Sequence, residues 1–217
     1  MKKRVLPIIV FLSLAMTSMA LPNDSIETTY RNGEFFSQYQ TKVKGSGIIA
    51  SEVTNDLLKD FHNKPNNLFN WALKGLGLQE EKKNELIFVL KSSISDAKTG
   101  ITHGKFDIIV PHIKTFNDVI VDVIVSKTKY NNGEMKVTAN IIYSSLLLKN
   151  ALGVLTIVPQ KNNELLFIAS VKIKFGWFFN IFITKKRYKN IVEWRIKKFT
   201  ENLKEECMHR EAVKLSY

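Results

Sequence analysis

The feature that most constrains this chain is a long succession of predicted β-strands, which covers about ninety residues from Leu86 onward. The pattern is clearest at residues 119–129, because every second residue from Val119 to Val125 is a valine. Such period-two alternation is typical of a strand with one buried face. Asn131-Asn132-Gly133 follows directly, and Asn and Gly accept the positive φ of tight hairpin turns. The chain is therefore predicted to fold around an antiparallel sheet.

Hairpin turns and alternating faces divide the region into strands. We predict strands at residues 86–94, 105–110, 119–129, 135–147, 151–158 and 165–175, and an earlier one at residues 34–44. The apolar face of the strand at 135–147 is expected to comprise Met135, Val137, Ala139, Ile141 and Tyr143. That of the last strand comprises Phe167, Ala169, Val171, Ile173 and Phe175.

Three further segments have the residue spacing of helices. Thr54 or Asn55 is a candidate N-cap for a first helix, and Pro65 suits the first turn of a second helix at residues 65–74. A longer amphipathic helix follows the sheet, and Arg195 interrupts its apolar stripe. The stripe recurs at steps of three and four residues through Tyr188, Val192, Phe199, Leu203 and Cys207.

Together these elements predict a single α+β domain at residues 34–217. Its curved antiparallel sheet has about six to seven strands, with two short helices and one long C-terminal helix packed on it. The order of elements over about residues 34–212 resembles the helix-grip fold of START-related and pollen-allergen-like proteins. That resemblance implies that the sheet wraps the last helix, with an apolar cavity between them for sterols, lipids or other hydrophobic ligands.

A second, shorter resemblance comes from a predicted helix at residues 66–76 followed by two stretches of the β region. "DAKTGITHGKFD", residues 96–107, and "VIVDVIVSKTKYNNGEMKVTANI", residues 119–141, are similar to a family of small exported bacterial proteins of unknown function. That family has a TATA-binding-protein-like fold. It implies an antiparallel sheet with helices on one face and names no function.

The N-terminus has the three parts of a secretory signal peptide. Lys2, Lys3 and Arg4 precede an apolar run, and Ser18-Met19-Ala20 forms a small-residue cleavage site. We predict a signal peptide at residues 1–20, cleavage after Ala20, and a flexible polar leader at residues 21–33. The protein is then secreted or periplasmic. Loss of the three cations lowers the net charge from +12 to about +9, which favours anionic partners.

Aromatic and basic residues are concentrated just after the last strand. Membrane contact through this segment is one hypothesis, with Trp177, Phe178, Lys185, Lys186 and Arg187 as the contact residues. The alternative is the solvated face of a helix. Nucleic-acid binding is not expected, because the chain lacks a recognised motif and is predicted to be exported.

Signatures of catalysis and metal binding are weak. No two histidines have a metal-ligand spacing, no G-x-S-x-G motif occurs, and no cofactor or metal is predicted. Cys207 is the only cysteine and is expected to be a buried small apolar residue. Asp122 lies among β-branched residues, so it is a possible polar anchor for a ligand, or a base, if its face lines a cavity. Exposure to solvent is the alternative.

We therefore predict an exported protein that binds a hydrophobic or amphipathic, lipid-like molecule between the sheet and the C-terminal helix. The expected lining residues are Val121, Val123, Tyr143, Val171, Ile173, Val192, Phe199 and Leu203. The same residues would form an ordinary filled core in a protein without a ligand. A structural protein that docks on anionic membranes is the other candidate, and no catalytic residue is assigned.

Overall fold

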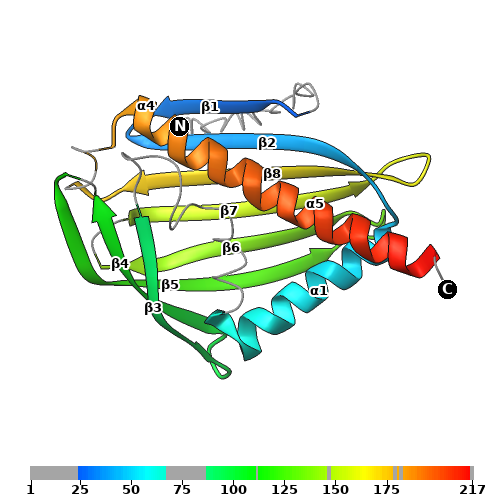
Figure 1. The fold of residues 1–217 in the computed structure, drawn as a ribbon, viewed down its shortest axis with the longest axis horizontal. Helices are drawn as coiled ribbons and strands as arrows, with labels where there is room; N and C mark the ends of the chain where they lie inside the picture. The colour runs from blue at the N-terminus through cyan, green and yellow to red at the C-terminus, as the bar shows by residue number, and fades with distance from the viewer. Residues whose placement is uncertain are drawn as a thin grey trace, which may run out of the picture.

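The computed structural model describes residues 24–66, 87–110, 112–145, 148–177, 180 and 183–215. Within these residues a hairpin and a helix come first, six strands follow, and a long helical segment comes last (Figure 1). In chain order the elements are β1 (Ile26–Arg31), β2 (Glu34–Lys44), α1 (Gly47–Asn63), β3 (Ile87–Asp96), β4 (Ile101–Val110), β5 (Lys114–Lys129), β6 (Met135–Ser144), β7 (Leu148–Pro159), β8 (Glu164–Phe175), α4 (Lys185–Tyr188), the π-helical turn η1 (Lys189–Glu193) and α5 (Trp194–Leu215).

The eight strands form one antiparallel sheet in the order β1-β2-β8-β7-β6-β5-β4-β3. Strands β3 to β8 form a meander, and β8 then pairs with β2, so that Phe35 lies opposite Ile173. This pairing brings the beginning of the chain and the end of the sheet together. Strand β1 extends the sheet beyond β2, and β3 forms the other edge.

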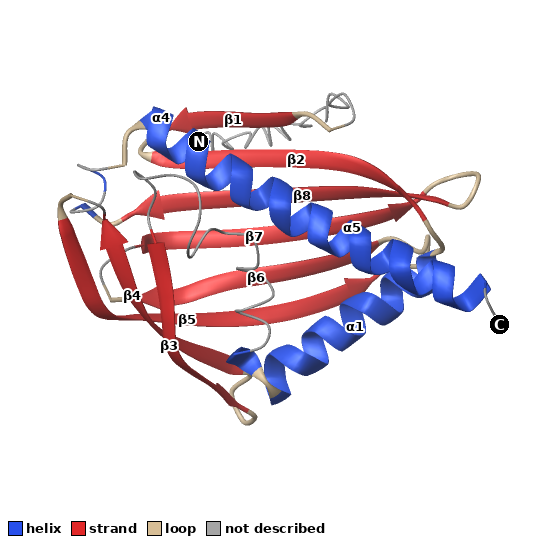
Figure 2. Ribbon diagram, viewed as in Figure 1, coloured by secondary structure: helices blue, strands red, loops and turns tan. Residues whose placement is uncertain are grey.

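Both long helices lie on the same, concave face of the sheet (Figure 2). Helix α5 crosses that face diagonally from the β1–β2 edge. Helix α1 meets α5 near the C-terminal end of α5 (Figure 1). Arg210 of α5 forms ion pairs with Asp56 of α1 and with Glu206 of its own helix. The predicted α+β fold, a curved antiparallel sheet around a long C-terminal helix, is confirmed, and its arrangement is that of the helix-grip fold.

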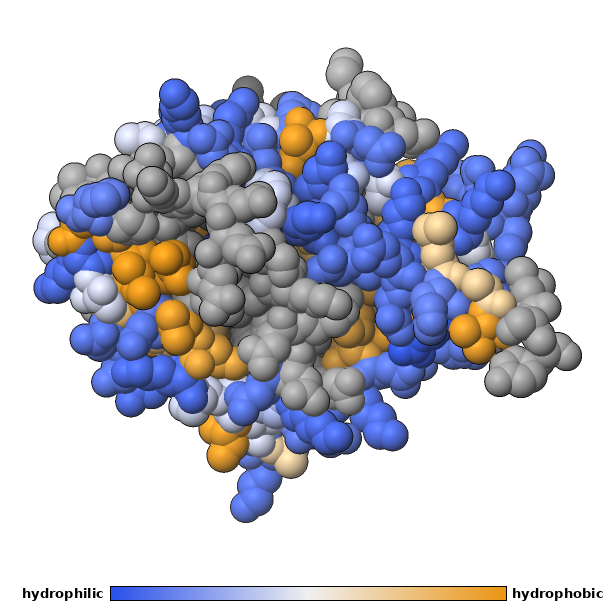
Figure 3. Space-filling view, in the orientation of Figure 1, coloured by the Kyte–Doolittle hydropathy of each residue, from blue (hydrophilic) through white to orange (hydrophobic). Residues whose placement is uncertain are grey.

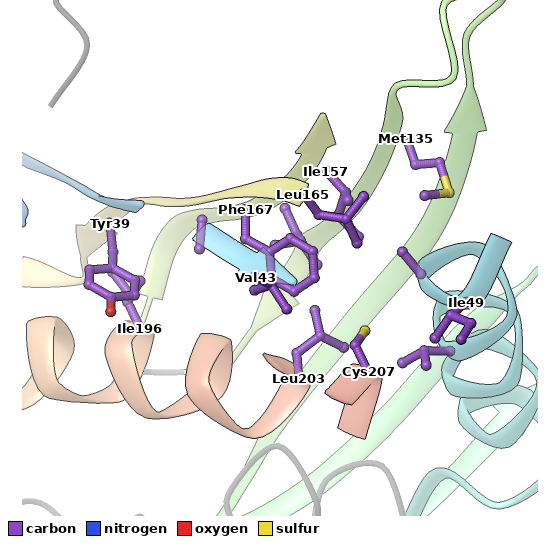
Figure 4. Close-up of a cluster of buried hydrophobic side chains, with 14 residues drawn as sticks. Tyr39, Val43, Ile49, Met135, Ile157, Leu165, Phe167, Ile196, Leu203 and Cys207 are labelled. Atoms are coloured by element: carbon purple, nitrogen blue, oxygen red, sulfur yellow. The ribbon is translucent and has the colours of Figure 1, made fainter. Parts of the chain in front are cut away.

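The first of two hydrophobic clusters lies where α5 and α1 meet the sheet, and we call it the helix cluster (Figure 4). Leu203 and Cys207 of α5 point toward Val43 and Phe167 of the sheet, and Ile49 approaches from α1. Burial of these side chains supplies the main hydrophobic stabilisation of this half of the molecule. Its buried members are Tyr39, Val43, Ile49, Ala50, Val53, Met135, Leu155, Ile157, Leu165, Phe167, Ala169, Ile196, Leu203 and Cys207.

The second cluster, which we call the aromatic cluster, lies beneath α4 and η1. Tyr188 stacks on Phe35 with ring centroids 3.9 Å apart, and Phe175 meets Tyr188 edge-on at 6.2 Å. Offset and edge-on ring pairs of this kind add to the stabilisation that burial gives. The buried members are Phe35, Ile108, Val110, Phe116, Val119, Phe175, Ile183 and Tyr188.

Several predicted boundaries need correction. Residues 26–31, expected in a flexible leader, form β1, because Asn32 and Gly33 adopt positive φ and close a hairpin with β2. Helix α1 begins before Thr54, since Ser46 is its cap: the Ser46 Oγ accepts a hydrogen bond from the Ile49 N–H. The sheet has eight strands, one more than the predicted upper bound. The predicted signal peptide and most of the predicted helix at 65–74 lie outside the described residues.

Candidate functional site

The concave face between the two clusters carries apolar side chains that are only half-buried, and we call this region the central band. Its sheet residues are Val121, Ile141, Val171 and Ile173. Val171 packs against the helix cluster and Ile173 against the aromatic cluster. From the helical segment, Val192 contacts both clusters. The band therefore joins the two filled ends of the core.

The helix supplies one wall of the central band. Phe199 is half-buried and follows Val192 by seven residues, which places both on the same side of the helix. Arg210, eleven residues further on, bonds to Asp56 of α1, so this side of α5 is turned toward α1. The outer side of α5, which faces away from the sheet, carries mostly hydrophilic residues (Figure 3). Apolar side chains are also visible on this face over the β3–β5 end of the sheet (Figure 3).

The structure separates the predicted lining residues into three groups. Val121, Val171, Ile173, Val192 and Phe199 lie half-buried in or beside the central band. Val123 and Leu203 are buried core residues, and Leu203 belongs to the helix cluster. Tyr143 does not share their face.

Tyr143 corrects the prediction made for its strand. Ile141 pairs with Val123 but Tyr143 pairs with Asp122, so Ile142 is an extra residue that forms a β-bulge. A bulge shifts the alternation by one position and reverses the face of every residue beyond it. Tyr143 therefore points to the convex face, where it is 52% exposed.

Asp122 also lies on the convex face, opposite to Val121 and Val123. Its Oδ1 is 2.8 Å from the Nδ1 of His103 on the neighbouring strand. This geometry does not support Asp122 as a polar anchor in the central band. Sequence spacing alone missed the pair, because the two residues are joined only by the register of β4 and β5.

Polar contacts attach helix α1 to the concave face of the sheet. The Nζ of Lys127 on β5 lies 2.6 Å from the Thr54 Oγ1, 2.8 Å from the Asn55 Oδ1 and 3.1 Å from the Ser51 carbonyl oxygen. Burial lowers the pKa of Lys127, with a smaller effect from Lys129. No pattern in the sequence indicates that this lysine links the strand to the helix.

Two tyrosines of the core have hydroxyl partners and raised pKa values. The Ser37 Oγ donates to the Tyr188 hydroxyl at 3.2 Å, and burial raises the pKa of Tyr188 to about 12. The Tyr39 hydroxyl donates to the Asp24 carboxylate at 3.2 Å, and burial, aided by that charge, raises the pKa of Tyr39 to about 12. Asp24 also accepts a 2.7 Å hydrogen bond from Thr41, the main cause of its own lowered pKa.

The predicted membrane-contact residues lie beyond the end of β8. Trp177 is 81% exposed, and the side chains of Lys185 and Lys186 are exposed as well. The Lys185 ammonium sits 4.9 Å from the ring centroid of Tyr30, a cation–π contact. Phe178 and the side chain of Arg187 lie outside the described residues.

The part of the chain that the structure describes offers little support for a reactive cysteine, a metal site or a membrane-spanning helix. Cys207 is buried in the helix cluster as predicted, and burial raises its pKa to about 12, which disfavours a reactive thiolate. Across the described ranges, no three His, Cys, Asp or Glu side chains gather closely enough to hold a metal ion. Within the same ranges, no helix combines the length and apolar character needed to span a bilayer.

No protein-family model matches this chain, and no curated protein matches its sequence. Several solved structures are similar in fold. A START superfamily protein from Mycobacterium smegmatis is 12% identical with a TM-score of 0.45, over 80% of this chain and 97% of that chain. A conserved protein from Geobacillus kaustophilus is 12% identical with a TM-score of 0.49, over 80% and 95%. Truncated norcoclaurine synthase from Thalictrum flavum is 12% identical with a TM-score of 0.40, over 83% and 98%. At this level of similarity nothing follows about ligands, and the helix-grip arrangement rests on the sheet order and on α5.

Proposed function

We propose that this protein binds a hydrophobic or amphipathic, lipid-like molecule in the central band, between the sheet and α5. The observation that supports it is the half-buried apolar surface of Val121, Ile141 and Phe199, which lies between two clusters whose members are buried. A ligand that covers half-exposed apolar surface on a concave face is stabilised by about 25 cal/mol per Å² of apolar surface removed from water. Sites for such ligands are concave and mostly apolar.

Two tryptophan substitutions on one strand test this proposal. Val121→Trp fills the central band, whereas Ile120→Trp adds the same side chain on the convex face, where Ile120 is already exposed. The measurement is binding of a fluorescent fatty-acid analogue, together with mass spectrometry of lipid that copurifies with the protein. We expect Val121→Trp to weaken binding at least tenfold, about 1.4 kcal/mol, and Ile120→Trp to leave it unchanged. Equal binding by both variants, or no binding by the unmodified protein, would overturn the proposal.

We also propose that the protein is exported and cleaved after Ala20. The signal-like pattern of residues 1–20 supports this, and Asp24, only three residues beyond Leu21, already bonds to Tyr39 and Thr41 of β2. Expression of the full chain in a bacterial host, with N-terminal sequencing of the periplasmic fraction, tests it. The expected first residue is Leu21. An uncleaved chain confined to the cytoplasm would contradict export.

Contact with an anionic membrane is a second candidate function, supported by the exposure of Trp177, Lys185 and Lys186, which all follow the end of β8. Aromatic rings at the interface and cations at the headgroups favour such contact, at about 1 kcal/mol per cation. The test is flotation with vesicles that contain anionic lipid, for the triple variant Lys185→Glu, Lys186→Glu, Arg187→Glu.

The matched control for that variant reverses the charge of three exposed lysines elsewhere in the chain. Its substitutions are Lys44→Glu, Lys129→Glu and Lys161→Glu. Because both triple variants carry the same net charge, a general electrostatic effect lowers flotation equally in each. Loss only in the first variant identifies the docking surface. Unchanged flotation of the first variant rules the surface out.

A further inference from the structure

The two edges of the sheet differ in how they are protected from pairing with another strand. The register of β3 with β4 is broken by a bulge between Leu90 and Ser92, and Lys91 stands at that point. Bulges and lysines are common means by which an edge strand is kept from pairing with other chains. Strand β1 has neither, because all six of its residues pair with β2 in one unbroken register and it contains no Lys or Pro. Of the two edge strands, β1 is therefore the one open to a partner (Figure 1).

The backbone of β1 offers hydrogen-bonding groups on its outer side. Arg31 and Glu34 flank the two-residue turn that joins β1 to β2, so they form a hydrogen-bonded pair, and the two kinds of pair alternate from there along the hairpin. Thr28 and Tyr30 stand at the non-hydrogen-bonded positions. Their N–H and C=O groups consequently point away from β2, toward the place that a further strand would occupy.

The side chains of β1 divide between the two faces of the sheet. Tyr30 lies on the concave face, where its ring centroid is 4.5 Å from that of Phe35. Glu27, Thr29 and Arg31 are exposed and alternate onto the convex face, with opposite charges two residues before and two residues after Thr29. Neither Glu27 nor Arg31 takes part in the ion pairs of the described residues. The strand is therefore complementary in charge to an antiparallel copy of itself.

We propose that two copies of this chain pair through β1, antiparallel to each other and about a two-fold axis at Thr29. Thr28 of each copy lies opposite Tyr30 of the other, and their outward backbone groups form the hydrogen bonds. Glu27 of each copy lies opposite Arg31 of the other, which adds two ion pairs to the dimer. Because both copies use the same surface, the assembly closes as a dimer and the two sheets become one. This inference goes beyond the proposed function and does not depend on it.

Reversal of single charges tests this register. Glu27→Arg and Arg31→Glu each place like charges opposite one another at both contacts of the dimer. We expect each variant to weaken dimerisation at least about tenfold, as measured by sedimentation velocity at protein concentrations up to about 1 mM. Because the chain is positively charged as a whole, a general charge effect would shift dimerisation of the two variants in opposite directions.

The two variants should pair with each other. In a one-to-one mixture each reversed charge meets its opposite in the mixed dimer, so dimerisation should return to the level of the unmodified protein. A further variant leaves the charges unchanged. Thr29→Cys should form a disulfide-linked dimer under mild oxidation, because the two Thr29 positions face each other across the axis. Thr128→Cys, equally exposed but on an inner strand, is the matched control and should form none.

An unmodified protein that stays monomeric up to about 1 mM would overturn the proposal. Dimerisation that survives both single reversals would also overturn it, since another surface would then hold the copies together. A mixture that stays monomeric, or disulfide formation no greater for Thr29→Cys than for Thr128→Cys, would exclude the register centred on Thr29. Should a charge variant fail to fold, the comparison of the two cysteine variants decides the question.

Discussion

The helix cluster and the aromatic cluster stabilise the same sheet by different means. The helix cluster consists mostly of aliphatic side chains from the sheet and α1, to which α5 adds Ile196 and Leu203, seven residues apart. The aromatic cluster depends on stacked rings and on one buried hydroxyl, that of Tyr188, which receives a hydrogen bond from Ser37. The helix changes to a π-helical turn directly after Tyr188. The regular helix thus contributes packed side chains to the helix cluster, and the irregular turn follows Tyr188, which needs both packing and a polar partner.

This difference bears on the central band. Val192 lies in the π-helical turn and packs against both clusters, so the turn lies where the filled core at each end gives way to half-buried residues. Two separate clusters allow the fold to be stable without a continuous core between them. The predictions below test how independent the two clusters are.

The largest effect is expected in the helix cluster. Leu203 is fully buried, and Leu203→Ala leaves a cavity where α5 meets the sheet, so it should lower the free energy of unfolding by about 2–5 kcal/mol. Urea unfolding followed by circular dichroism measures this loss. Met208→Ala, at an exposed position on the same helix, should change it by no more than about 0.5 kcal/mol. A loss below about 1 kcal/mol for Leu203→Ala would show that the helix cluster is not the main source of stability.

A smaller effect is expected where α1 is attached to the sheet. Lys127→Met removes the ammonium group that bonds to Ser51, Thr54 and Asn55, at an expected cost of about 1.5–3 kcal/mol. Hydrogen exchange of Lys127→Met should be accelerated, relative to the unmodified protein, more in α1 than in the aromatic cluster. Lys129→Met, at an exposed position of the same strand, is the control. Equal stability of the two variants would contradict the link.

The smallest effect at neutral pH is expected in the aromatic cluster. Tyr188→Phe keeps the stacked ring but loses the Ser37 hydrogen bond, at a cost of about 1 kcal/mol. Its pH dependence is more informative. The pKa of Tyr188 rises from an ordinary 10.0 to about 12 on folding, so the unfolded chain ionises first. The stabilisation is complete below about pH 10 and is lost as the pH rises toward 12.

Stability of the phenylalanine variant should therefore fall less steeply than that of the unmodified protein between pH 10 and 12. Part of the slope should remain, because the pKa of Tyr39 is also raised to about 12 and Tyr39 is unchanged. Tyr130→Phe, at an exposed position, is the control and should keep the full slope. If Tyr188→Phe and Tyr130→Phe have the same alkaline slope, burial of the Tyr188 hydroxyl does not govern this cluster.

Much of the sheet could be predicted because its signals are local. The predicted strand at residues 34–44 matches β2, and Asn162 and Asn163 adopt the positive φ expected of the turn before β8. The apolar faces of β5 and β8 also agree with the predicted alternation. The missed strand β1 had a local signal of the same kind, the Asn32-Gly33 turn in the middle of a Thr- and Tyr-containing stretch.

The errors at the candidate site have a different origin. No property of residues 135–144 reveals that Ile142 is an extra residue, because the bulge exists only relative to the strand beside it. Tyr143 was therefore assigned to the wrong face. His103 and Asp122 are likewise brought together by the register of two strands.

The sequence by itself determined where the strands turn, which side chains alternate along them, and that a striped helix follows the sheet. These properties depend on backbone preferences and spacing within a few residues. Only the tertiary structure decided which face of the sheet the helices cover, where the bulge in β6 falls, and that two separate clusters leave a half-buried band between them. Those outcomes depend on contacts between strands and helices far apart in the chain, and such contacts form only when the whole sheet has assembled.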